Sequence, residues 1–94
     1  MANVAADIYV DGFVQGVGFR QFAYQKSKEC GVYGSVRNLR DGRVLVFAEG
    51  DQGCMDRFLA AIRRGPPGAK VRSLHIEQKA YTGEYREFTV LFDV

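Results

Sequence analysis

The sequence is poor in the residues that most often build metal centres and nucleophilic active sites. Its 94 residues include one histidine, two cysteines and no tryptophan. Neither Cys30 nor Cys54 lies in a CxxC pattern or near the histidine, so we expect buried thiols rather than a disulfide or a metal site. His75 alternates with Leu74 and Ile76, which predicts an exposed strand residue rather than a catalytic base. We therefore predict no metal and no cofactor.

Long apolar runs and a large charge imbalance are also missing. No segment approaches the roughly 20 apolar residues of a membrane span, and residues 1–7 lack the pattern of a secretory signal, so we expect a cytoplasmic protein without a membrane partner. The net charge of +2 is too small for a basic surface that would bind nucleic acid. With 47% hydrophobic and 26% charged residues, the composition is typical of a globular protein. We predict a single domain over residues 1–94 and a monomer.

Apolar periodicity divides the chain into strands and two helices. Alternation predicts strands over residues 7–14, 32–39, 73–77 and 87–92, the last with Phe88, Val90 and Phe92 on one face. A nearly continuous apolar run predicts a central strand over residues 44–48. Helical spacing predicts a helix over residues 19–30, ended by a left-handed cap at Gly31. A second helix follows Asp51, which can cap it, and stops at the Gly-Pro-Pro-Gly sequence of residues 65–68.

The order of these elements predicts the fold class. Asp41-Gly42 between two β-rich runs is a strong hairpin signal, which makes the strands on either side of it antiparallel neighbours. The order βαββαβ with a short extra C-terminal strand describes an α+β, ferredoxin-like split βαβ sandwich, in which two helices cover one face of an antiparallel sheet. Enzymes, sensors and RNA-binding domains share this fold, so the fold alone does not decide function.

A glycine-rich stretch lies between the first strand and the first helix. Gly16 and Gly18 permit backbone conformations that turn successive N–H groups toward one point, and Arg20 adds a planar fork of donors, so the stretch could hold a phosphate group. A plain tight turn followed by a solvated arginine explains the same local pattern. The stretch matches neither the P-loop nor the dinucleotide-binding fingerprint. The choice between the two interpretations depends on the rest of the chain.

Three segments together resemble the acylphosphatase family. They are Val14–Arg20 (VQGVGFR), Gly34–Asn38 (GSVRN) and Asp41–Val44 (DGRV), which appear in the order and at the separation of that family's signature. The resemblance also covers the strand order and nearly the whole chain. One departure is Ser35, where the family usually has an aromatic residue, and we expect it to affect local packing or substrate fit more than the chemistry.

The resemblance implies hydrolysis of acyl phosphates to a carboxylate and inorganic phosphate, which would also be a competitive inhibitor. It implies that Arg20 binds the phosphoryl oxygens and that Asn38 positions the attacking water. The phosphate would be held by backbone amides of a loop formed by Gln15, Gly16, Val17, Gly18, Phe19 and Arg20.

General chemistry agrees with this residue set. The leaving carboxylate has a conjugate-acid pKa of about 4, so it needs no general acid, and the loose transition state mainly needs positioning and charge stabilisation. By local pattern alone, Asn38 is equally a turn former beside Asp41-Gly42. Two alternatives remain, a catalytically silent anion-binding module and an RNA-binding module, although residues 43–47 lack the glycine and aromatic spacing of RNA-recognition strands.

Overall fold

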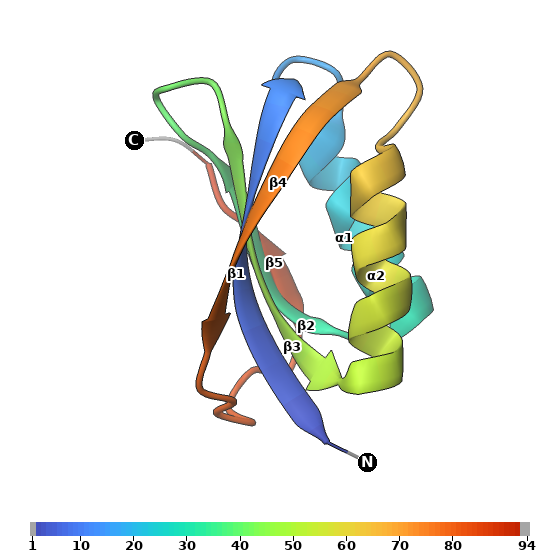
Figure 1. Ribbon diagram of the computed structural model, residues 1–94, viewed down its shortest axis with the longest axis vertical. Coiled ribbons are helices and arrows are strands. Elements are labelled where there is room, and N and C mark those ends of the chain that lie inside the picture. The colour runs from blue at the N-terminus through green and yellow to red at the C-terminus, as the bar shows by residue number, and fades with distance from the viewer. Residues whose placement is uncertain (1, 93–94) are drawn as a thin grey trace.

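The computed structural model describes residues 2–92, which form a five-stranded sheet with both helices on one of its faces (Figure 1). The strand order is β4-β1-β3-β2-β5. The predicted α+β, ferredoxin-like architecture is confirmed. The elements are β1 (Asn3–Phe13), α1 (Phe19–Cys30), β2 (Tyr33–Asn38), β3 (Val44–Asp51), α2 (Gln52–Arg64), β4 (Lys70–Lys79) and β5 (Phe88–Val90).

The core lies between the sheet and the two helices. Ile8 and Val10 of β1 and Val46 of β3 are fully buried, whereas Tyr9 and Phe47 on the opposite face are half-buried. This alternation follows from the period of two of a strand, which lets one face be buried while the other meets solvent. The helices bury Phe19, Ala23 and Ser27 from α1 and Met55, Phe58, Ala61 and Ile62 from α2.

The fifth strand corrects the prediction of a fully antiparallel sheet. The pairs β1–β3, β1–β4 and β2–β3 are antiparallel, but β5 pairs in parallel with β2, so the sheet is mixed. The chain leaves β4 at one edge and crosses that end of the sheet to reach the opposite edge (Figure 1). Since β5 re-enters from the same end, it runs antiparallel to β4 and therefore parallel to β2. It is also shorter than the predicted strand over residues 87–92.

The ends of both helices agree with the sequence signals. Gly31 has φ +86°, and its N–H donates to Ser27 O at 2.8 Å, as a left-handed cap requires. The Asp51 carboxylate accepts from Cys54 N at 2.8 Å, and this bond holds the pKa of Asp51 below its ordinary value. Cys30 and Cys54 are free thiols as expected, but both are half-buried rather than buried.

The segment between β4 and β5 is tied to the sheet by a buried carboxylate. Glu49 of β3 is 1% exposed, although it lies on the face without helices. Its oxygens accept from Thr82 N at 3.1 Å, from the Thr82 hydroxyl at 3.0 Å and from Gly83 N at 3.0 Å. The ring of Tyr85 in the same segment packs against Phe47 with centroids 5.0 Å apart. The crossing segment thus covers part of the open face.

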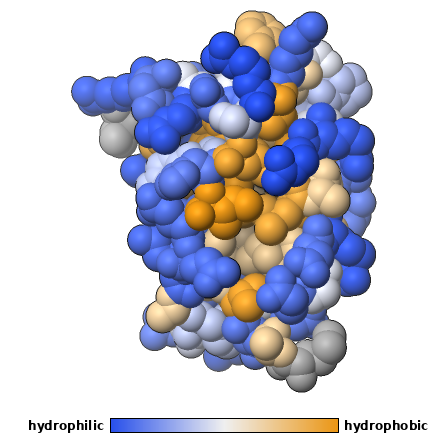
Figure 2. Space-filling model, viewed as in Figure 1, coloured by the Kyte–Doolittle hydropathy of each residue, from blue (hydrophilic) through white to orange (hydrophobic). Residues whose placement is uncertain are grey.

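The seam between the sheet edge and α2 is apolar. Figure 2 shows hydrophobic side chains in a band between these two layers, bordered by hydrophilic ones. Leu59 of α2 and Val71 and Leu74 of β4 are partly buried against the core there. His75 points to solvent on the other side of β4, as predicted, with 67% of its side chain exposed. Neither helix of residues 2–92 is long and apolar enough to span a membrane.

Candidate active site

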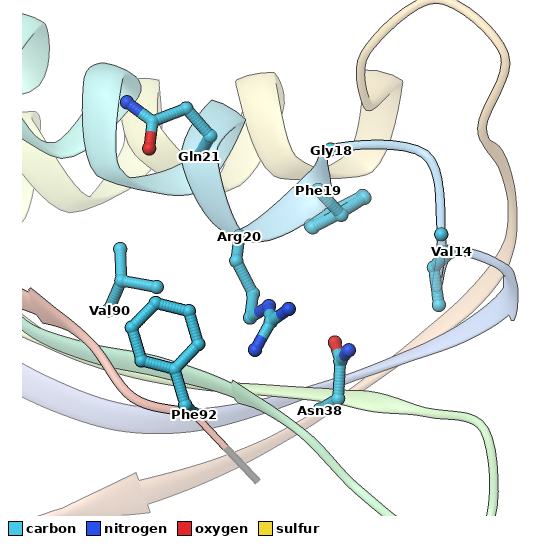
Figure 3. Close-up of a pocket in the computed structure, with 9 residues that line it drawn as sticks. Val14, Gly18, Phe19, Arg20, Gln21, Asn38, Val90 and Phe92 are labelled. Atoms are coloured by element: carbon cyan, nitrogen blue, oxygen red, sulfur yellow. The ribbon is translucent and has the colours of Figure 1, made fainter.

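Three segments that are distant in sequence meet at the end of the sheet where β1 leads into α1. They are the loop after β1, the β2–β3 hairpin and the residues that follow β5 (Figure 1). Between them lies a pocket of about 210 Å³, smaller than the roughly 300–1,000 Å³ of sites that hold drug-sized ligands. The pocket is lined by Val14, Gly16, Gly18, Phe19, Arg20, Gln21, Asn38, Val90 and Phe92 (Figure 3).

The glycine loop opens the N-terminus of α1 toward this pocket. Gly16 and Gly18 have φ +78° and +77°, and an added Cβ at either would meet no atom within 4 Å, so conformation rather than space requires glycine. Gly18 is the N-cap, and the first helical bond runs from Phe22 N to Gly18 O at 3.0 Å. The amides of residues 19–21 therefore have no helical acceptor. The N-terminus of α2 differs because the Asp51 side chain caps it by accepting from Cys54 N.

Arg20 extends from the first turn of α1 across the pocket toward Asn38 (Figure 3). Its Nη1 donates to Leu91 O at 3.3 Å, and its guanidinium lies 5.2 Å from the centre of the Phe92 ring. The hydrogen bond uses one of the five N–H donors of the guanidinium and leaves others for a ligand. The arginine is thus held in place by the chain that follows β5.

The residues after β5 are a part of the pocket that the sequence did not reveal. Periodicity predicts Phe88, Val90 and Phe92 on one strand face, but β5 ends at Val90, and Phe92 is 77% exposed beside Arg20. The strand pattern holds as far as Leu91, whose N–H donates to Val36 O at 2.8 Å. The last aromatic ring of the pattern therefore lies at the rim of the pocket and not in the core.

Asn38 is the last residue of β2 and shares the helix-covered face with Val36. The hairpin that follows it is confirmed, but the turn spans residues 39–43 rather than two residues. Leu39 N donates to Arg43 O at 2.8 Å, and Gly42 N donates to Leu39 O at 3.2 Å. Gly42 has φ +97°, which explains why glycine follows Asp41.

An ion pair fixes the shape of the same turn. Arg43 Nη2 lies 2.8 Å from Asp41 Oδ2, and Arg43 N donates to Asp41 Oδ1 at 3.0 Å. The arginine holds the pKa of Asp41 below its ordinary value, and the carboxylate raises the pKa of Arg43. The guanidinium also lies 4.8 Å from the centre of the Tyr9 ring. The turn next to Asn38 is therefore braced on the helix-free side of the sheet.

Four of the six predicted loop residues line the pocket, and two do not. Gly16, Gly18, Phe19 and Arg20 are among the lining residues, together with Asn38. Val17 packs against the core instead. The Gln15 side chain reaches the hairpin, where Nε2 donates to Leu39 O at 2.7 Å and to Arg43 O at 2.9 Å.

Ser35 lies away from the pocket. It occupies the position opposite Phe47 in the β2–β3 ladder, on the face without helices, whereas Asn38 points to the other face. The ring of Tyr85 packs on Phe47 there. The small side chain of Ser35 thus affects packing on that face of the sheet and does not change the shape of the pocket.

The arrangement suits a small anion. It offers the positive end of a helix, unpaired amides, a guanidinium with free donors and a neutral carboxamide across the pocket. Residues 2–92 contain no group of three or more His, Cys, Asp or Glu side chains placed to hold a metal ion. The polar groups that the pocket offers to an anion are therefore the Arg20 guanidinium, the amides at the start of α1 and the Asn38 carboxamide.

Curated relatives and solved structures that match nearly their whole length are described as acylphosphatases. The family model for acylphosphatase matches residues 6–90. An acylphosphatase of Methylococcus capsulatus is 52% identical over 87 residues, which cover 93% of this chain and 95% of the relative. One from Archaeoglobus fulgidus is 45% identical over 89 residues, covering 95% and 99%. The crystal structure of acylphosphatase from Bacillus subtilis superposes with a TM-score of 0.90 at 33% identity, covering 94% of this chain and 98% of that one.

Proposed function

The chain belongs to the acylphosphatase family and hydrolyses acyl phosphates, and from this premise we propose that Arg20 and Asn38 carry the reaction. One observation supports the assignment above all others: the Arg20 guanidinium points across the pocket at the Asn38 carboxamide (Figure 3). The open N-terminus of α1 lies beside both of them. A substrate phosphate between these groups would meet donors on one side and an ordered water on the other.

The proposed roles follow from the charge of the reacting group. The amides at the start of α1 and the Arg20 guanidinium bind the phosphoryl oxygens and stabilise the charge that they carry in the transition state. Asn38 both donates and accepts, so it holds a water in line with the bond to the leaving carboxylate. That carboxylate departs unprotonated because its conjugate acid has a pKa of about 4. The reaction therefore needs neither a general acid nor a metal.

Further properties belong to the same proposal. The amides at the start of α1 and the Arg20 guanidinium together form a phosphate cradle. Inorganic phosphate, the product, would occupy this cradle and compete with substrate. We also propose a single domain over residues 1–94 that acts as a monomer in the cytoplasm without nucleic acid, and the two free thiols fit a reducing compartment.

The test is hydrolysis of acetyl phosphate by the purified, chelator-treated protein, with inorganic phosphate as competitor. Arg20→Ala should lower kcat by about 10³-fold or more, and Arg20→Lys should not restore it, because a point charge replaces a planar fork. Asn38→Ala should lose turnover while its inhibition constant for phosphate stays close to that of the unmodified protein.

Two exposed residues of the same types serve as controls. Arg37→Ala on the helix-free face of β2 and Asn3→Ala at the start of β1 should keep full activity. The proposal for Arg20 is wrong if a folded Arg20→Ala variant retains turnover. Loss of phosphate binding with turnover preserved in Asn38→Ala would contradict its role in positioning water.

A further inference from the structure

Gln15 makes a direct connection between the two halves of the pocket. Its carboxamide nitrogen donates to Leu39 O at 2.7 Å and to Arg43 O at 2.9 Å, across 24 and 28 residues of sequence. A carboxamide nitrogen has two N–H groups, so both are in use. Gln15 begins the loop that opens the helix N-terminus, and Leu39 directly follows Asn38. The side chain thus joins the loop that precedes α1 to the residue next to Asn38.

The sheet itself does not provide this connection. β3 separates β1 from β2, and its pairing with β1 ends at Val10 and Val44. Past this point β1 pairs with β4 only. Within residues 2–92, the two bonds of Gln15 are the hydrogen bonds that join the glycine loop to the hairpin. Together with the core packing of Val14 and Phe19, this side chain therefore sets the distance between the loop and Asn38.

The hairpin does not need Gln15 in order to form. Its ladder pairs six residues of β2 with β3, and its turn has two backbone bonds and the Asp41–Arg43 ion pair. The carbonyls of Leu39 and Arg43 already accept from Gly42 N and Leu39 N, and each has a second lone pair for Gln15. Gln15 therefore contributes more to the position of the hairpin relative to the glycine loop than to the folding of the hairpin.

We propose that Gln15 is a positioning residue for hydrolysis, which holds Asn38 at a fixed distance from the phosphate cradle. The proposal rests on the function proposed for Asn38 above. In-line attack is sensitive to distance, and a displacement of about 1 Å can cost on the order of 100-fold in rate. Phosphate binding depends on Arg20 and the amides of α1, which Gln15 does not contact. Loss of Gln15 should therefore lower kcat and spare phosphate affinity.

Two variants of nearly equal shape remove the donors. Gln15→Met has no polar atom to donate, and Gln15→Glu places carboxylate oxygens against two carbonyl oxygens. We expect kcat to fall by about 10- to 100-fold in both, with the inhibition constant for phosphate changed by less than about threefold. Gln25→Met on the exposed face of α1 is the matched control and should behave as the unmodified protein. Urea unfolding shows that each variant is folded.

A double-mutant cycle with Asn38→Ala separates positioning from a general structural role. If Gln15 acts through Asn38, adding Gln15→Met to Asn38→Ala should lower kcat by less than about twofold more. The proposal is overturned if Gln15→Met and Gln15→Glu keep kcat within about twofold, if their loss is repeated in full in the Asn38→Ala background, or if phosphate affinity falls as much as kcat. An active Asn38→Ala variant would instead show that the proposed function of Asn38 is wrong.

Discussion

Replacing the Glu49 carboxylate tests how the edge strand β5, and with it the partner of Arg20, is held in place. Glu49 is 1% exposed and accepts from Thr82 N, Gly83 N and the Thr82 hydroxyl at 3.0–3.1 Å. The hydroxyl also lies 3.2 Å from the second oxygen, but its single hydrogen can be donated only once. Three donors therefore hold one buried charge.

The expected loss is smaller than the sum of these bonds. Hydrogen bonds to a charged group contribute about 1.5–3 kcal/mol each, which would give about 5–9 kcal/mol for three. Thr82 and Gly83 are themselves exposed, so water can satisfy their donors once the carboxylate is gone. We therefore expect Glu49→Gln to lower the free energy of unfolding by about 2–3 kcal/mol. For a chain of this size the loss corresponds to a fall in Tm of roughly 10–20 °C.

The measurement is urea unfolding followed by circular dichroism or by fluorescence of the five tyrosines, since the chain has no tryptophan. Glu84→Gln is the matched control, because Glu84 is an exposed glutamate in the same segment. In native conditions kcat should fall as well, because the segment leads into β5 and Leu91. An unfolding midpoint for Glu49→Gln equal to that of the control would refute the reasoning.

Two other changes test the loop and the hairpin. Gly18→Ala should cost about 1–2 kcal/mol because φ is +77°, and it should weaken phosphate binding. Gly68→Ala, at φ +89°, is the control: it should lose similar stability in urea and leave phosphate affinity unchanged. If the two glycine variants changed phosphate affinity equally, the result would argue against a phosphate cradle at Gly18. Asp41→Asn should lower stability in neutral solution. Because the folded pKa of Asp41 lies below 3.8, its stabilisation is present above that pH and is lost as the pH falls through the folded pKa. The unfolding free energies of the two proteins should therefore converge as the pH falls below the folded pKa of Asp41, and a difference that does not change with pH would contradict the ion pair.

Local sequence determined most of the elements. The period of two in Ile8 and Val10, the glycine at position 31 and the carboxylate of Asp51 each specify a structure within a few residues of themselves. Such signals depend on short-range sterics and hydrogen bonds, so they can be recognised without knowledge of the rest of the chain. The resemblance carried by the segments around Arg20 and Asn38 then gave the family, which the comparisons confirm.

Only the tertiary structure decided how these segments meet. No local pattern encodes that β5 runs parallel to β2, that Phe92 emerges beside Arg20, or that the Glu49 carboxylate is buried under the crossing segment. Nor does the sequence show the Gln15 side chain turning from the cradle to the hairpin. Each of these contacts joins residues at least 24 positions apart and depends on the strand order, since only the path of the chain across the sheet brings their atoms within hydrogen-bond or ring-contact distance.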